Sequence, residues 1–138
     1  MPFIYKNFVS VDDYLLLRES VHWMELCSEQ AQQGLKNSAY VIGCYDDNNI
    51  VGTARILWDG GYIAYLSDVI VLPQYQGKGI GRHMVERAIA FVESQLKTGW
   101  KIKIILVSSK GTEGFYKQFG FIERPNNESG SGMDLWVR

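Results

Sequence analysis

The sequence predicts an α/β (α+β) protein in which a mixed, mostly antiparallel sheet of about six or seven strands carries helices on both faces. Three observations predict this fold class. The chain has 138 residues, enough for one domain, 1–138, with a sizeable core. Its apolar residues change from helical to alternating spacing near residue 38. A glycine-rich turn then joins a strand to an amphipathic helix.

The first half of the chain predicts two helices followed by an antiparallel meander. One helix begins at Ser10, with Asp13 three residues later as in a capping box. A second helix covers 28–33 and ends at Gly34. The strands, which alternate and are rich in β-branched residues, cover 38–45, 50–58 and 62–72.

The second half predicts alternating helices and strands. The helix after the glycine-rich turn has a stripe of apolar side chains, and Gly99 ends it. The stripe consists of Val85, Ala88, Ile89, Val92 and Leu96. A buried strand over 101–107 and a short helix over 112–118 follow. Two more strands are predicted at 121–124 and 133–137.

Charge and composition exclude several function classes. Fourteen basic and fifteen acidic residues give a net charge of −1, so no nucleic-acid partner is expected. No apolar run reaches the roughly 18 residues that span a bilayer, and the N-terminus does not resemble a signal peptide. We therefore expect a cytoplasmic protein with no membrane partner. Cys27 and Cys44 are predicted to be buried, reduced thiols, and no metal site is expected.

The residues that indicate chemistry follow the third meander strand. The run Val69–Pro73 leads through a glycine-rich turn into a helix. Glycines allow close backbone approach, and the free N–H groups at a helix start bind phosphate well. The dinucleotide fingerprint fails, because Arg82 occupies the place of its third glycine. The nucleotide P-loop string is absent from the sequence.

Two motifs instead resemble the GNAT superfamily of acyl-CoA-dependent N-acetyltransferases. Gln76-x-x-Gly79-x-Gly81, after a Val-x-Val-x-Pro strand, is similar to the family's acetyl-CoA motif, Arg/Gln-x-x-Gly-x-Gly/Ala. The run 114–121 is similar to its Phe-Tyr-x-x-x-Gly-Phe element. The predicted element order agrees with the family over about the whole chain. The resemblance implies a splay between the fourth and fifth strands, where the pantetheine arm lies like an extra strand.

The resemblance also implies acetyl-CoA as co-substrate, with no metal. Backbone groups near Val69 and Val71 would pair with the pantetheine amides, and an N–H near Val69 or Ile70 would stabilise the oxyanion. Amides of 76–82 would hold the pyrophosphate. Ser109 lies where many members carry an asparagine that touches the pantetheine arm, and its shorter hydroxyl is a departure from that pattern. The implied cofactor-binding residues are Val69, Ile70, Val71, Gln76, Gly77, Lys78, Gly79, Ile80, Gly81, Arg82, Ser109 and Tyr116.

The implied activity is transfer of the acetyl group to a primary amine of a small-molecule acceptor by direct attack. Tyr116 is the candidate acid toward the CoA thiolate, with packing against the sheet as the alternative. Asp68 is the candidate base or amine-binding group, and an ion pair with Arg55 is the alternative. Strand alternation predicts that Asp68 and Ser67 face opposite sides.

Two other functions stay open at this point. The chain could be a protein or peptide N-acetyltransferase, or a non-catalytic acyl-CoA-binding module. A homodimer is possible, although no sequence feature marks an interface. The sequence does not identify the amine acceptor, because a fold does not define a substrate.

Overall fold

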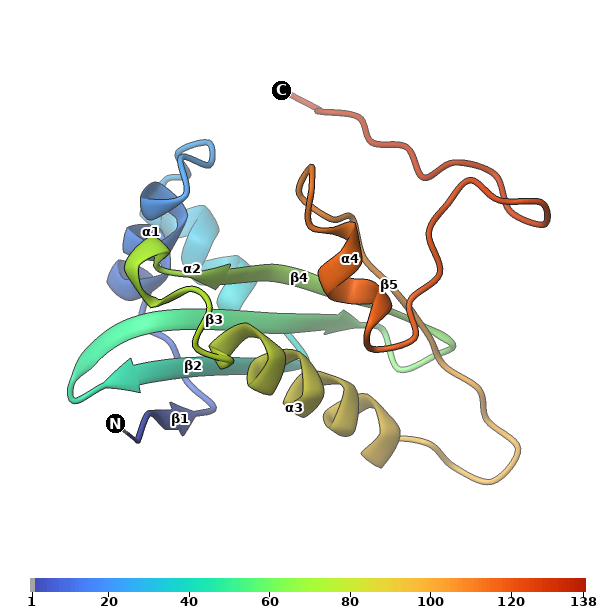
Figure 1. Cartoon of the computed structure of the whole chain (residues 1–138), viewed down its shortest axis with the longest axis horizontal. Coiled ribbons are helices and arrows are strands. Elements are labelled where there is room, and N and C mark those ends of the chain that lie inside the picture. Colours follow the sequence, from blue (N-terminus) through green and yellow to red (C-terminus); the bar gives the residue numbers. More distant parts are fainter. Residues whose placement is uncertain (1) are drawn as a thin grey trace. The chain divides into compact units, whose positions relative to one another are not determined.

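The computed structural model describes residues 2–138, which divide into two compact units. The first ends at Ile105, and the second is Leu106–Arg138. The first unit contains the sheet and the three longer helices (Figure 1). The second unit contains one short helix, α4 (Glu113–Lys117). The single domain over 1–138 stays a prediction.

The first unit is built on a five-stranded sheet in the order β1-β2-β3-β4-β5. Neighbouring strands are antiparallel except β4 and β5, which are parallel. This is the mixed, mostly antiparallel sheet that the sequence predicts, with a smaller number of strands. The elements are β1 (Ile4–Lys6), α1 (Val11–Ser20), α2 (Ser28–Lys36), β2 (Tyr40–Asp46), β3 (Asn49–Trp58), β4 (Ile63–Val71), the 3₁₀ helix η1 (Pro73–Tyr75), α3 (Ile80–Ser94) and β5 (Lys103–Ile105).

Helices cover both faces of this sheet, as predicted (Figure 1). A Cβ atom added at Gly52 of β3 would meet side chains of α3, Met84 and Ile80. On the other face, Arg55 of β3 bonds the Gly34 carbonyl of α2. Residues 52 and 55 differ by an odd number, so strand alternation places them on opposite faces. The α1–α2 face is the one that bears on the functional site.

The core on the α1 side depends on residues spaced along that helix. Leu17 is fully buried, whereas the adjacent Leu16 is 49% exposed. We expect Leu17→Ala to lower the free energy of unfolding by about 2–5 kcal/mol, because truncation leaves a cavity. Leu16→Ala is the matched control and should cost less than about 1 kcal/mol. Urea denaturation of both variants measures this, and equal losses would contradict the assignment of the buried face.

Among the local predictions, the Ser10 cap and the meander hold, whereas two helix ends differ. The Asp13 amide donates to the Ser10 hydroxyl at 3.1 Å, which confirms the capping interaction at the start of α1. The three meander strands form within two residues of their predicted ends and pair in the predicted antiparallel order. Helix α2 does not stop at Gly34 but continues to Lys36. Helix α3 ends at Ser94, so Leu96 lies beyond it and is 46% exposed.

The strand predictions err at both ends of the chain. Strand β1 is not predicted, because three residues are too few to show a period. Strands predicted at 121–124 and 133–137 are wrong, since the described unit 106–138 contains no strand. In the second segment Met133, Leu135 and Val137 are 92%, 84% and 86% exposed. Their alternation therefore has no sheet face to bury against.

The structure differs from the expectation for one of the two cysteines. Both thiols are free, and Cys44 is buried, but Cys27 is exposed. The prediction of two buried thiols is thus wrong for Cys27, which precedes the first residue of α2. Within residues 2–138 no helix is long and apolar enough to cross a membrane.

Candidate functional site

Strand β4 contains a bulge at its centre. Arg55 of β3 lies opposite Ser67, and Thr53 lies opposite Ile70, so two residues of separation on β3 match three on β4. The extra residue is accommodated where Asp68 adopts a φ of 54°, a left-handed conformation that non-glycine residues rarely take. The predicted alternation of Ser67 and Asp68 fails here, because the Asp68 carboxylate bonds Arg55, the residue opposite Ser67.

The bulge changes which backbone groups of β4 point away from β3. Before it, the Tyr62 carbonyl accepts a hydrogen bond from the Lys103 amide, so even-numbered residues point toward β5. After it, the Leu72 amide donates to the Val51 carbonyl at 2.9 Å, so even-numbered residues point toward β3. The amides of Val69 and Val71 consequently point to the edge opposite β3.

That edge of β4 is open beyond its first residues. The pairing of β4 with β5 covers only Ile63–Tyr65 against Lys103–Ile105. From 66 to 71, β4 has no partner strand on this side among the described residues. The predicted splay between these two strands is therefore present, and within the first unit it leaves the Val69 and Val71 amides without a pairing strand.

The turn after β4 is held at its base and open at its tip. The Tyr75 hydroxyl donates to Asp46 at 2.6 Å, and the Gln76 side-chain amide donates to the Val71 carbonyl at 3.1 Å. Gly77 and Gly79 have φ values of 79° and 84°, in the left-handed region that favours glycine. A Cβ atom at either position would meet nothing within 4 Å. The backbone there is accessible to a ligand.

Helix α3 begins at this turn without a side-chain cap. Gly79 occupies the N-cap position and has no side chain to bond the first amides. The N–H groups of the first helical turn have no partner within a helix, and the helix dipole adds partial positive charge there. Lys78 and Arg82 are exposed beside the turn, although Arg82 also pairs with Glu86 at 3.6 Å. The arrangement can hold a diphosphate.

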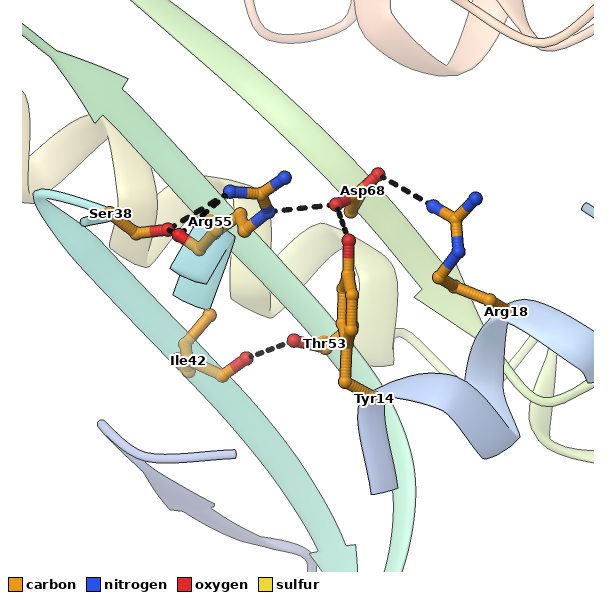
Figure 2. A network of polar contacts seen from close by, with 8 residues as sticks. Tyr14, Arg18, Ser38, Ile42, Thr53, Arg55 and Asp68 are labelled. Atoms are coloured by element: carbon orange, nitrogen blue, oxygen red, sulfur yellow. Dashed lines mark hydrogen bonds and ion pairs between the residues drawn. The ribbon is translucent and has the colours of Figure 1, made fainter. Parts of the chain in front are cut away.

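A polar cluster fixes Asp68 on the α1 side of the bulge (Figure 2). We call Tyr14, Arg18, Arg55 and Asp68 the Asp68 cluster. The Tyr14 hydroxyl and Arg55 Nε both donate to Asp68 Oδ2, the second at 2.7 Å. Arg18 Nη1 lies 3.7 Å from Oδ1. The ion pair with Arg55 that the sequence offers as an alternative is confirmed.

Burial and charge keep the donors of this cluster protonated. Desolvation raises the pKa of Tyr14, and the negative charge of Asp68 with its hydrogen bond raises that pKa further. Desolvation alone would lower the pKa of Arg55, but the Asp68 carboxylate outweighs it and the net shift is upward. Tyr14 therefore donates as a neutral phenol and Arg55 as a cation at neutral pH.

The other candidate residues lie in the second unit, 106–138. Tyr116 is on α4, half-buried, with edge-on ring contacts to Phe115 and Phe121 at centroid distances of 4.9 and 6.1 Å. Ser109 is exposed, and its carbonyl accepts hydrogen bonds from the Thr112 amide and hydroxyl. The roles of Tyr116 and Ser109 stay predictions.

The structure brings part of the predicted set together in the first unit. Residues 69–71 and 76–82 form one continuous strand–turn–helix segment. Ile70 and Ile80 are only 2% and 1% exposed, so their side chains belong to the core and do not contact a ligand. Tyr14 and Arg18 are additional residues of the Asp68 cluster that the sequence does not predict as site residues. Their i, i+4 spacing on one helix face is the signal that could have found them.

Within residues 2–138 no group of three His, Cys, Asp or Glu side chains is placed to hold a metal ion. Asp59, another acidic residue near a strand end, accepts the Gly61 amide at 2.8 Å and closes its own turn. The backbone segment around β4 and α3 therefore remains the candidate ligand site of the first unit.

Comparisons with known proteins agree with this geometry. A family model described as acetyltransferase (GNAT) domain matches residues 37–123. An uncharacterised N-acetyltransferase ycf52 of Pyropia yezoensis is 30% identical over 118 residues. That match covers 83% of this chain and 66% of the relative, so the chain spans slightly less than two thirds of the relative's length.

Solved structures share the fold. A probable acetyltransferase of unknown function from meticillin-resistant Staphylococcus aureus superposes with a TM-score of 0.86 at 24% identity, covering 99% of this chain and 100% of that one. A structure described as a predicted acetyltransferase with acetyl-CoA, from Clostridium acetobutylicum, gives a TM-score of 0.71 at 18% identity, covering 99% of this chain and 95% of that one. These likenesses extend over essentially the whole chain.

Proposed function

The chain belongs to the GNAT family of acetyltransferases, and from that premise we propose that it transfers the acetyl group of acetyl-CoA to a primary amine of a small molecule. The observation that carries the proposal is the segment 69–82. An open strand edge with two outward amides leads directly into an uncapped helix start with left-handed glycines. Acetyl-CoA is a thioester on a long amide-containing arm that leads to a diphosphate. The amides of the arm match the open strand edge, and the diphosphate matches the uncapped helix start.

Different residues of this segment would bind different parts of acetyl-CoA, the acyl donor. The Val69 and Val71 backbone groups would pair with the pantetheine amides as another strand does. Amides of 76–82, with the charges of Lys78 and Arg82, would hold the pyrophosphate. The residues present fit acetyl-CoA, because the glycine positions leave space around the backbone and no side chain competes for the first helical amides.

The proposed reaction is a direct displacement at the thioester. The neutral amine nitrogen attacks the carbonyl carbon, the carbon–sulfur bond breaks, and the amine loses one proton while the sulfur gains one. Of the two candidate oxyanion donors, the Val69 N–H points to the open edge, whereas Ile70 points toward β3. The Val69 N–H would therefore stabilise the oxyanion, a contact commonly worth about 3 kcal/mol. Tyr116 would donate to the developing thiolate. The cytoplasmic location and the possible homodimer stay predictions.

Free-thiol release with a panel of acceptors tests the proposal. We expect acetyl-CoA-dependent thiol release with at least one free polyamine, amino acid or aminoglycoside, and mass spectrometry should find one added acetyl group on that amine. Lysine-containing peptides under the same conditions should give slower release. Acetylation of peptides alone would favour the protein-acetyltransferase alternative. Binding of acetyl-CoA without release on any amine would favour the non-catalytic module.

A further inference from the structure

We propose that Asp68 is a positioning residue: the Asp68 cluster locks the β4 bulge, and the bulge directs the Val69 and Val71 amides toward the acyl donor. This inference rests on the proposed function, because it gives the bulge a role in acyl transfer. It also replaces the general-base interpretation of Asp68 with a different task for the same carboxylate.

The backbone at Asp68 needs an external restraint. A φ of 54° is disfavoured for any residue with a Cβ atom, and no glycine relieves it at this position. Asp68 is held instead through its side chain, which is 11% exposed and accepts from donors on β3 and α1. The side-chain bonds stabilise a conformation that the backbone alone would leave.

The donors are themselves anchored. Arg55 Nη1 donates to the Gly34 carbonyl at 3.2 Å and to the Ser38 hydroxyl at 3.1 Å. Arg18 Nη2 donates to the Met24 carbonyl at 2.8 Å, in the connection between α1 and α2. The carboxylate therefore ties the bulge to β3 and to both helices on this face (Figure 2). Relaxing the bulge would require breaking these contacts together.

Loss of the bulge would misdirect the functional amides. Without the extra residue the alternation of β4 would continue unchanged past Leu66, and the Val69 and Val71 amides would point toward β3. The same carboxylate is badly placed to accept a proton from a substrate. Oδ2 already accepts from Tyr14 and Arg55, and Oδ1 faces Arg18, so an ammonium group would have to displace one of them.

Four variants separate positioning from base catalysis. Asp68→Asn keeps one carbonyl acceptor for the cluster, whereas Asp68→Ala keeps none and retains the strain of the left-handed φ. Tyr14→Phe removes one hydroxyl and leaves the Asp68 carboxylate intact. Glu19→Gln, at an exposed carboxylate on the same helix, is the matched control. The measurements are kcat, KM for acetyl-CoA and the pH profile of kcat/KM.

If Asp68 positions the bulge, activity should rank wild type, then Asp68→Asn, then Asp68→Ala. We expect a loss in kcat/KM of about tenfold for Asp68→Asn and about a hundredfold for Asp68→Ala, comparable with misplacing one oxyanion donor. Tyr14→Phe should also lose several-fold, and the pH profile should keep its shape in all variants. Equal losses in Asp68→Asn and Asp68→Ala, with the acid limb removed and Tyr14→Phe unaffected, would overturn the inference in favour of a base.

A readout without turnover keeps this inference separate from the proposed function. Hydrogen exchange of the Leu72 amide, which bonds Val51, reports the β3–β4 register beyond the bulge. We expect about tenfold faster exchange in Asp68→Ala than in Glu19→Gln. Unchanged exchange would refute the locking role even if the enzyme proves active. Absence of transfer by the wild type would refute the function and leave this exchange test standing.

Discussion

Gly79→Glu is expected to abolish acetyl-CoA binding. Gly79 is the N-cap residue of α3, and its backbone borders the amides proposed to hold the pyrophosphate. A glutamate there would place a carboxylate against the diphosphate and fill the space that the ligand needs. We expect the dissociation constant to rise at least a hundredfold, equivalent to about 3 kcal/mol, as measured by isothermal titration calorimetry.

The structure offers a matched control for this variant at Gly99. Both glycines are exposed, with φ values of 84° and 82°, and a Cβ atom at either would meet nothing within 4 Å. Gly99→Glu therefore carries the same backbone strain and the same added charge. It lies beyond the far end of α3, a helix of 15 residues and thus about 22 Å long. Equal affinity of both variants for acetyl-CoA would show that this turn does not bind the cofactor.

The parts of the site that sequence predicts are those made by local chemistry. The Ser10 cap needs only a hydroxyl three residues before an amide, and the turn at 77–79 needs glycines at positive φ. Both requirements are met by residues that are close together in the sequence. The sequence therefore predicts the strand–turn–helix segment, and the structure contains it.

The bulge and its cluster could not be predicted in the same way. An aspartate at φ 54° has no sequence signature, since a glycine would be the usual mark of such a backbone. The partners of Asp68 come from residues 13 to 54 positions away in sequence. Alternation alone assigns Asp68 to the opposite face from Ser67. Only the pairing of the two strands, in which three residues of separation on β4 match two on β3, reveals the error.

The unpredicted strand and the wrongly predicted ones have a common physical origin. A strand exists through its partner, so a three-residue edge such as β1 forms because β2 pairs with it. The ring of Tyr5 on β1 also stacks on His83 of α3 at a centroid distance of 4.0 Å. The segment 133–137 has the better alternation but no pairing in the described unit 106–138. An alternating sequence indicates which side chains a strand could bury. Whether the strand forms depends on a neighbouring strand with which it can pair.

Tyr116→Phe is expected to lower kcat much more than it changes the KM for acetyl-CoA. The substitution removes one hydroxyl and keeps the ring, whose edge-on contacts with Phe115 and Phe121 do not need that oxygen. An amine attacking a thioester expels a thiolate, and a nearby phenol stabilises the charge as it forms. We expect kcat to fall by about 10²–10⁴, the range for a positioned acid.

The size of the effect follows from the relative acidities. A phenol has a pKa near 10 and a thiol one near 8.5, so complete proton transfer would be uphill by about 2 kcal/mol. In the proposed reaction the Tyr116 phenol would therefore act chiefly as a hydrogen-bond donor in the transition state, where the sulfur carries most charge. Such an interaction is weak in the ground state, which is why KM should change less than about threefold.

The control and the opposing result both come from steady-state kinetics. Tyr62→Phe removes a hydroxyl from a residue that is 66% exposed in the other unit, and it should leave kcat and KM unchanged. A loss for Tyr116→Phe that appears wholly in KM would show that the hydroxyl binds acetyl-CoA equally in the ground and transition states. A kcat within about threefold of the wild type would instead assign Tyr116 to packing and leave the thiolate to be protonated by water.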